Sequence, residues 1–341
     1  MDREKTFVRA LTGEIKMRLS ERKRLDTLYF GGGTPSLLSD ESWMEIFSAF
    51  RQHAEIFTES EITIEANPAS ITVAAAKFWR GIGVNRVSVG VQSLNGDILL
   101  YLNRIHTSEN ALDAVRILNE TGMDNVNADL IYSIPGQRTM DVIDAIDRLS
   151  PWIDHLSAYA LTIVPGTPFA RRGVTLPDSD VVADQYERIV DRAAAAGLER
   201  YEVSNFSRHG AESRHNLNTW RYGACVALGP SAAGFDGSRR YKNIADFLKY
   251  AKAIQSGELP ESESEEADPS TAFWDRLMLG LRTREGVRLS PDERAGLAAI
   301  ADSAGLGDHL EWTENGARLK PDKIVLLDEI LTRLRVAAPC R

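Results

Sequence analysis

The chain has 341 residues, with 40 Lys and Arg against 49 Asp and Glu, so its formal net charge is −9. This acidity argues against a nucleic-acid partner, because phosphate binding requires a basic face. The sequence has no apolar run near the about 20 residues of a membrane span, and its first residues are charged, unlike a signal peptide. These features predict a cytoplasmic protein with one large and one smaller domain.

The first stretch, residues 1–19, is predicted to be an amphipathic helix with Phe7, Leu11 and Ile15 on one stripe. Apolar runs then alternate with helical stretches. The predicted strands cover 27–30, 61–65, 86–91, 126–131, 156–161 and 200–203. The predicted helices cover 39–52, 72–80, 108–121, 139–149 and 178–196, with caps at Ser39 or Asp40, Ser70 or Thr72, Ser108, and Thr139. This α/β alternation predicts a parallel sheet, as a closed or partial barrel or as an open doubly wound sheet.

The pattern changes after about residue 245. Residues 258–268 are acidic and contain Pro and Ser, which predicts a linker or an exposed excursion. From residue 271 we expect two or three helices and a hairpin over 310–319, with its turn at 314–316. The expected parts are a barrel over 1–245, an acidic linker or excursion over 246–270, and a small winged-helix-like α+β domain over 271–341.

Polar or glycine residues lie at or near the ends of most predicted strands: Gly31–Thr34, Glu65–Asn67, Gln92, Asp129 and Tyr159. Because the carboxyl ends of parallel strands share one edge, these residues are expected in one mouth, although each could simply cap the next helix. The glycines let backbone N–H groups approach a ligand, and a tight turn explains them about as well. Glu65 suits an ammonium group or ribose hydroxyls, or a helix cap. Arg104 and Asp129 suit a charged ligand, or a mutual salt bridge.

Longer motifs point to a family. They are TLYFGGGTPSLL, EITIEANP, GVNRVSVGVQS, LNRIH, ADLIYSIPGQ, LSAYALTIVPGTP, YEVSNF and HNLNTW, between about residues 27 and 236. On these motifs the chain resembles the oxygen-independent coproporphyrinogen oxidase branch of the radical S-adenosylmethionine (SAM) superfamily, and within it the heme chaperones of the HemW family. The resemblance implies a partial (β/α)6 TIM-type barrel, and residues 271–335 are similar to the family's C-terminal domain. It also implies SAM-binding positions at Gly32, Gly33, Thr34, Glu65, Gln92, Arg104, Asp129 and, beside the adenine, Ala160.

The cysteines depart from the family pattern. The family has a CxxxCxxC loop after its first strand, and this sequence opens with the helix that follows that loop. A [4Fe–4S] cluster needs closely spaced thiolates, whereas Cys225 and Cys340 lie far apart and Cys225 suits a small buried apolar position. We therefore expect no cluster on this chain, weak SAM binding, and an unpaired edge beside the strand 27–30. A misassigned start and a true truncation both explain the difference.

The segment from His215 to Trp220 resembles the HNxxYW motif of the heme chaperones, with Thr219 in place of its Tyr. The resemblance implies that His215 is an axial ligand of heme iron and that Trp220 packs on the macrocycle. Ala233 replaces a His that family members often carry in a GPSAHSF segment. No functional role is expected for the other histidines, at positions 53, 106, 155, 209 and 309.

Three functions compete. The first is a heme-binding chaperone that passes heme to an acceptor, such as a membrane-associated respiratory protein. The second is a coproporphyrinogen III oxidase (dehydrogenase)-like enzyme of porphyrin biosynthesis. The third is a degenerate, non-redox barrel that binds SAM or heme. The HNLNTW motif favours the chaperone over the enzyme, and the missing cysteines favour a non-catalytic chain as given.

Overall fold

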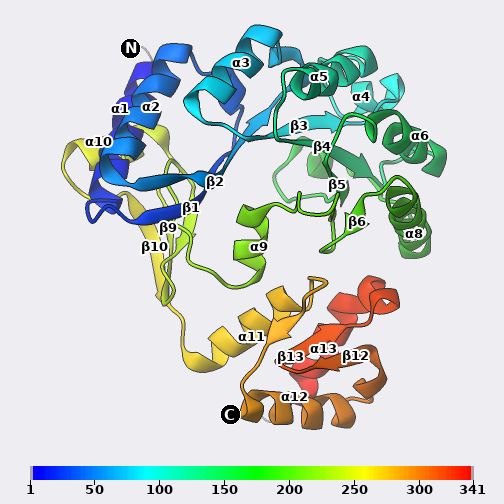
Figure 1. Ribbon diagram of the computed structural model, residues 1–341. Helices are drawn as coiled ribbons and strands as arrows, with labels where there is room; N and C mark the ends of the chain where they lie inside the picture. The colour runs from blue at the N-terminus through cyan, green and yellow to red at the C-terminus, as the bar shows by residue number, and fades with distance from the viewer. Residues whose placement is uncertain (1–2, 339–341) are drawn as a thin grey trace.

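A seven-stranded sheet bent into a partial barrel forms the centre of the computed structural model, which describes residues 3–338 (Figure 1). The strand order is β1-β2-β3-β4-β5-β7-β6. Strands β1 to β5 are parallel, while β7 runs antiparallel to β5 and β6 antiparallel to β7. The strands are β1 Arg24–Phe30, β2 Glu55–Ala66, β3 Arg86–Gln92, β4 Asn125–Tyr132, β5 His155–Ala160, β6 Glu199–Arg200 and β7 Asn205–Ser207. The predicted partial TIM-type barrel is confirmed.

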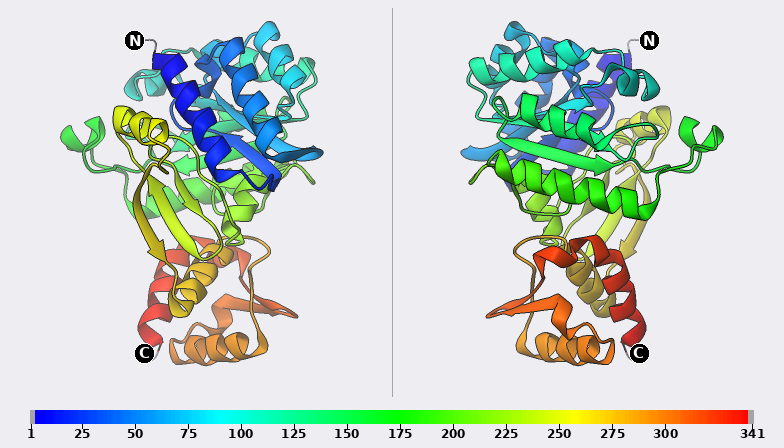
Figure 2. Two further views of the ribbon diagram at one scale, coloured as in Figure 1. Left: turned by 90° about the vertical axis from the view of Figure 1, so that its left-hand side faces the viewer. Right: turned by 90° about the vertical axis from the view of Figure 1, so that its right-hand side faces the viewer.

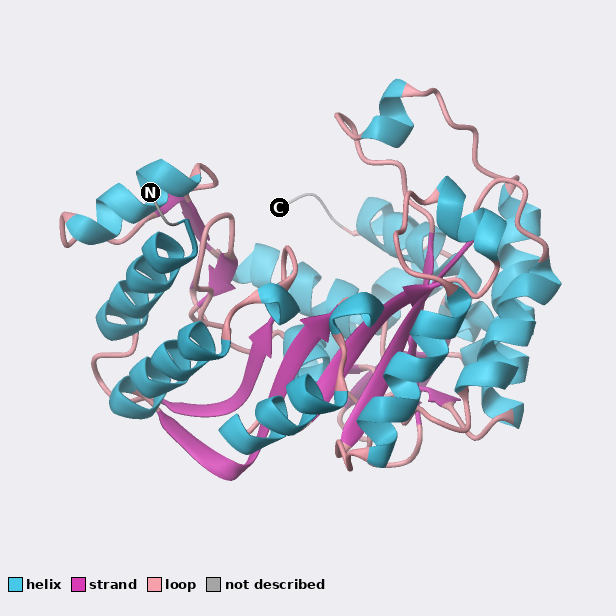
Figure 3. Ribbon diagram, turned by 90° about the horizontal axis from the view of Figure 1, so that it is seen from above, coloured by secondary structure: helices cyan, strands magenta, loops and turns pink. Residues whose placement is uncertain are grey.

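Helices cover the outer face of this sheet (Figure 3). They are α1 Arg3–Arg18, α2 Asp40–His53, α3 Val73–Ile82, α5 Ser108–Glu120, α6 Thr139–Leu149 and α8 Ser179–Ala195, with the shorter η1 Pro35–Leu37, η2 Pro68–Ser70, α4 Gly96–Tyr101 and α7 Pro168–Arg171 in the loops. Ser39 and Thr72 cap their helices as predicted, because each hydroxyl accepts a backbone N–H in the first turn. The other two caps lie one residue earlier than predicted, at Thr107 and Arg138.

The predicted strand over 200–203 is wrong beyond Arg200. The chain turns there, and the buried Glu202 carboxylate accepts the Ser204 N–H at 3.2 Å. Strand β7 then returns antiparallel to β6, and no pattern in the sequence predicted this strand. The following helix, α9 Arg214–Trp220, lies below the barrel (Figure 1).

The acidic stretch is a strand rather than an irregular linker. It forms β10 Glu261–Glu266, the edge of a second sheet with β9 Arg239–Asn243 and β8 Ala233–Phe235, and the helix α10 Phe247–Gln255 precedes it. Most of β10 is exposed, as expected for an excursion. Arg18 and Arg239 both bind the Glu261 carboxylate, which neutralises part of the acidic run and explains why it pairs.

One buried carboxylate joins this second sheet to the barrel. Glu14 of α1 is 0% exposed and accepts hydrogen bonds from Arg18, Asn243, Tyr250 and the N–H of Gly229 at 2.7–2.8 Å. A buried charge is tolerated only when it is paired and fully hydrogen-bonded, and Glu14 meets that condition. The network therefore fixes the loop after α9 against α1.

The C-terminal part has its own apolar core and lies below the barrel (Figure 2). Its elements are α11 Pro269–Gly280, β11 Val287–Arg288, α12 Pro291–Ser303, η3 Gly307–His309, β12 Leu310–Thr313, β13 Gly316–Leu319, η4 Pro321–Leu326 and α13 Leu327–Ala337. The predicted hairpin is confirmed, since β12 pairs with β13 across Thr313 and Gly316. The division of the chain near residues 245 and 270 stays a prediction. Within residues 3–338, no helix is long and apolar enough to cross a membrane.

Candidate functional site

The glycine-rich turn after β1 is held open by one carboxylate. Glu65, near the end of β2, accepts the Tyr29 hydroxyl at 2.9 Å and the Gly32 N–H at 3.1 Å. Gly32 and Gly33 have φ of 78° and 82°, a conformation that side chains other than glycine rarely adopt. Glu65 therefore shapes this turn and does not cap a helix, which settles one alternative from the sequence.

The other predicted SAM positions also lie at the carboxyl edge of the sheet. Gln92 ends β3 with a φ of 65°, next to a register shift in its pairing with β4. Ala160 ends β5, and Arg104 is half-buried in the loop that follows α4. This common edge is where parallel α/β folds build their sites. The roles of these residues in binding SAM stay predictions.

Asp129 of β4 belongs to a polar network inside the barrel. Its carboxylate accepts hydrogen bonds from Ser88 at 3.1 Å and Asn127 at 2.8 Å, and it is not paired with Arg104. Burial raises the pKa of Asp129, while these hydrogen bonds oppose the rise. Asn127 also accepts from the ring of His155 at 2.7 Å, so the network extends to β5. The mutual salt bridge considered for Arg104 and Asp129 is absent among the described residues.

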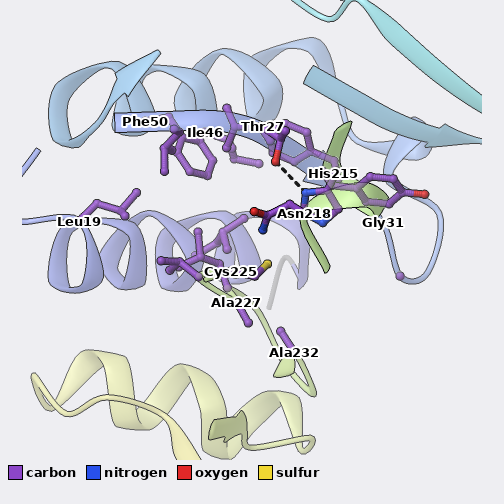
Figure 4. Close-up of a pocket in the computed structure, with 18 of the residues that line it drawn as sticks. Leu19, Thr27, Gly31, Ile46, Phe50, His215, Asn218, Cys225, Ala227 and Ala232 are labelled. Carbon is purple, nitrogen blue, oxygen red and sulfur yellow. Dashed lines mark hydrogen bonds between the residues drawn. The ribbon is translucent and has the colours of Figure 1, made fainter. Parts of the chain in front are cut away.

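His215 enters from α9 and meets β1. Its Nδ1 lies 2.9 Å from the Thr27 hydroxyl (Figure 4). Its ring stacks on that of Tyr29, with centroids 5.0 Å apart. The Glu61 carboxylate accepts the His215 backbone N–H at 2.9 Å, which anchors the first turn of α9. Burial lowers the pKa of His215, with the nearby charge of Arg86 acting in the same direction and that of Glu61 opposing it. The imidazole is therefore neutral near pH 7.

Trp220 and Cys225 lie close to His215 in the sequence, in α9 and in the segment after it. Trp220 is the last residue of α9 and does not line the cavity that His215 lines, and its packing on a macrocycle stays a prediction. Cys225 lines that cavity and is half-buried rather than buried, and burial raises the pKa of its thiol. Cys340 lies outside the described residues.

A cavity of about 1020 Å³ runs along β1, and we call it the β1 groove. Figure 4 shows Ile46 and Phe50 of α2 on one side and Cys225 and Ala227 on the other. The groove brings together some of the predicted site residues: Gly32, Thr34, Glu65 and His215 all line it. Gln92, Arg104, Asp129, Ala160 and Trp220 do not line it.

The residues present do not fit an iron–sulfur cluster. The sequence has two cysteines, and such a cluster needs several closely spaced thiolates. Within residues 3–338, no three His, Cys, Asp or Glu side chains gather as a metal site would require. His215, by contrast, offers the single nitrogen that one axial position of a heme iron needs.

Several residues at the site were missed from the sequence: Thr27, Tyr29 and Glu61. Thr27 and Tyr29 alternate with Leu28 along β1, so they share the barrel face with Gly31. That period of two along β1 could have identified Thr27 and Tyr29. No sequence pattern could have identified Glu61, because its contact with the N-terminus of α9 joins segments more than 150 residues apart.

Comparisons with known proteins show which family has this arrangement. Residues 8–149 match the Radical SAM superfamily. The chain is 35% identical over 329 residues to the heme chaperone HemW of Mycobacterium tuberculosis, covering 93% of this chain and 84% of that protein. It is 31% identical over 269 residues to the heme chaperone HemW of Bacillus subtilis, covering 77% of this chain and 71% of that protein.

A solved structure shares the fold. The coproporphyrinogen III oxidase HemN of Escherichia coli, a radical SAM enzyme, matches with a TM-score of 0.83 over 98% of this chain and 84% of that chain. Its sequence identity is 19%, so this likeness concerns the fold alone. With the identity to the chaperones extending over most of both chains, the protein belongs to the HemW family of the radical SAM superfamily.

Proposed function

We propose that this protein is a heme-binding chaperone that passes heme to an acceptor protein. The observation that carries the proposal is His215, a neutral imidazole beside a large, mostly apolar groove. The relatives of Mycobacterium tuberculosis and Bacillus subtilis that match at 35% and 31% identity are named heme chaperones, whereas the likeness to the coproporphyrinogen oxidase is one of fold. A cytoplasmic location and a respiratory acceptor stay predictions.

The geometry at His215 supports a ligand role. When Nδ1–H donates to Thr27, Nε2 carries the lone pair that would bind iron. Histidines that bind metals are usually oriented in this way, through a hydrogen bond from their other ring nitrogen. Stacking on Tyr29 fixes the ring plane as well. Thr27 and Tyr29 are thus positioning residues, and His215 is the proposed ligand.

A hemin titration followed by absorbance tests the proposal. The wild-type protein should give a saturable Soret band, and His215→Ala should shift or abolish it and weaken binding at least about tenfold. His209→Ala is the matched control, because His209 is exposed and lies on a turn before α9. An unchanged spectrum and affinity in His215→Ala would remove the main support for the chaperone function.

We also propose weak SAM binding at the strand ends. SAM carries an amino group, a carboxylate and ribose hydroxyls, and the open turn at Gly32 with the carboxylates of Glu65 and Asp129 offers complementary groups. The family's cluster does not fit the cysteines of this sequence, so we assign no radical step to these residues.

Calorimetry with SAM tests this second proposal. We expect weak binding that falls further, by about tenfold, in Glu65→Ala and in Asp129→Ala, because each loses a charge-assisted contact. Asp113→Ala on the outer face of α5 is the control, since Asp113 is exposed and far from the strand ends. Equal affinities in both variants and the wild type would place SAM elsewhere.

A further inference from the structure

One cation lies inside the barrel without a partner. Arg86, at the start of β3, is 2% exposed, and within residues 3–338 it is the sole Lys or Arg side chain that is buried. Its guanidinium forms no hydrogen bond or ion pair with any other residue in that range, and its Nε is enclosed without an acceptor. Buried charges in folded proteins are nearly always paired, so this one calls for an explanation.

Three carboxylates lie on β2 and β4, the strands on either side of β3, and each is already bound to other donors. Glu61 accepts the backbone N–H groups at the start of α9. Glu65 accepts the Gly32 N–H of the glycine-rich turn, and Asp129 belongs to the polar network inside the barrel. The charge of Arg86 therefore acts on these carboxylates at a distance and not through an ion pair.

The groups that this charge affects show where the guanidinium lies. Burial raises the pKa of Tyr29 on β1 and of Asp129 on β4, and the charge of Arg86 opposes the rise in both. Burial lowers the pKa of His155 on β5, and the charge of Arg86 acts in the same direction. These groups lie on strands on both sides of β3, so the guanidinium lies in the barrel interior.

Asp129 is the carboxylate that this arrangement serves. Arg86 and Ser88 share one face of β3, two residues or about 7 Å apart along the strand. The Ser88 hydroxyl in turn lies 3.1 Å from the Asp129 carboxylate. The other titratable groups around Asp129 on neighbouring strands supply no positive charge near neutral pH: they are Tyr29, Glu65, His155 and Tyr159.

We propose that Arg86 is a positioning residue whose unpaired charge keeps the buried Asp129 carboxylate ionised, so that its oxygens can accept hydroxyl groups of a ligand. A direct salt bridge would occupy the same oxygens, and a protonated carboxyl group would present a donor in place of an acceptor. The ligand part of this inference rests on the SAM site proposed above, whereas the ionisation of Asp129 does not.

A carbon-13 NMR titration of the Asp129 carboxyl group tests the proposal without any ligand. In full-length protein labelled at the aspartate carboxyl carbons, Asp129→Asn identifies the signal by its loss. Arg86→Gln should raise the pH midpoint of this signal by about one pH unit or more, because a charge at such a distance in a protein interior shifts a carboxyl group by that amount. Arg86→Lys should keep the midpoint near the wild-type value, because it retains the charge.

Arg116→Gln is the matched control, because Arg116 is exposed on the outer face of α5 and pairs with Asp113. Its midpoint should equal that of the wild type. If Arg86→Gln does not fold, Arg86→Met replaces it, since an apolar side chain of similar length needs no partner. An unchanged midpoint in the folded variant would overturn the proposal. So would an equal shift in Arg86→Lys, since shape and not charge would then be responsible.

Calorimetry with SAM at several pH values separates this inference from SAM binding itself. The pH below which SAM affinity falls should rise in Arg86→Gln by the same amount as the carboxyl midpoint. An unshifted SAM profile beside a shifted midpoint would overturn the ligand part of the inference. A shifted midpoint without SAM binding in the wild type would contradict the SAM proposal and leave the action of Arg86 on Asp129 in place.

Discussion

The polar network inside the barrel and the β1 groove differ in how many hydrogen bonds their side chains already make. The network lies on β3, β4 and β5, and the groove runs along β1 at the edge of the same sheet. In the interior, Ser88, Asn127, Asp129 and His155 bind one another through hydrogen bonds of 2.6–3.2 Å. In the groove, the walls are mostly apolar. The interior side chains therefore hold one another in place, whereas the apolar walls of the groove leave space for a ligand.

This difference gives opposite expectations for substitutions. A change in the bonded interior leaves partners unsatisfied, so it should lower the free energy of unfolding. A change in the groove removes few existing bonds, so it should alter binding more than stability.

The largest effect is expected for Asn127→Leu. Asn127 is 1% exposed and joins Ser88 and Asp129 on one side to His155 and Ser157 on the other. Its loss leaves several buried groups unpaired, which should cost about 3 kcal/mol of unfolding free energy. Urea denaturation measures this, with Asn119→Leu on the exposed face of α5 as a control that should change stability by about 0.5 kcal/mol or less. Equal costs in the two variants would contradict a bonded interior.

The next effect concerns pH. Burial lowers the pKa of His155 well below its ordinary value of 6.5, and the charge of Arg86 adds to this. Below pH 6.5 the unfolded chain therefore takes up a proton that the folded chain does not, so stability falls as the pH drops. His155→Asn should flatten this slope by up to about 1.4 kcal/mol per pH unit.

Unfolding curves at several pH values between 5 and 7.5, chosen from the ordinary histidine range, measure the slope. His209→Asn should keep the wild-type slope, because that side chain is exposed. If His155→Asn lowers the free energy of unfolding by the same amount at every pH, the His155 imidazole takes up protons alike in the folded and unfolded chains. That result would contradict the buried, neutral His155 described above.

The smallest effect on stability is expected on the groove side. Thr27→Val keeps the shape of the side chain and removes the hydroxyl that lies 2.9 Å from His215 Nδ1. Hemin affinity should fall about tenfold, as for other residues that orient a metal ligand. The free energy of unfolding should change by about 1 kcal/mol or less, because one hydrogen bond is lost. If Thr27→Val instead lowered the free energy of unfolding strongly and left hemin affinity unchanged, Thr27 would act in stability rather than in binding.

The sequence predicted the parts of the fold that depend on local patterns. The alternation of apolar runs and helices predicted β1 to β5 and their helices within about three residues, except that β2 begins at Glu55, six residues before the predicted start at residue 61. The sequence pattern did not predict β10, where six acidic or serine residues form a strand. The contacts that neutralise Glu261 come from Arg18, far away in α1, and from Arg239 on the neighbouring strand β9. The pattern also failed at residues 200–207, where a buried carboxylate makes the turn.

The sequence predicted those residues of the site that lie within family motifs. The positions at the strand ends and His215 followed from family motifs, and the structure places them at one edge of the sheet or in the groove. The partners of His215 could not be predicted, because its contacts with Thr27 and Glu61 join α9 to the first two strands across more than 150 residues. Sequence spacing carries no signal for such contacts.

Resonance Raman spectroscopy of the ferrous heme complex tests the central claim most directly, because the iron–histidine stretching band reports the bond itself. The wild-type protein should show this band, His209→Ala should keep it, and His215→Ala should lose it while the protein stays folded. A band of unchanged intensity and frequency in His215→Ala would show that another residue holds the iron, and His215 would then have only the structural role that its contacts with Thr27, Tyr29 and Glu61 provide.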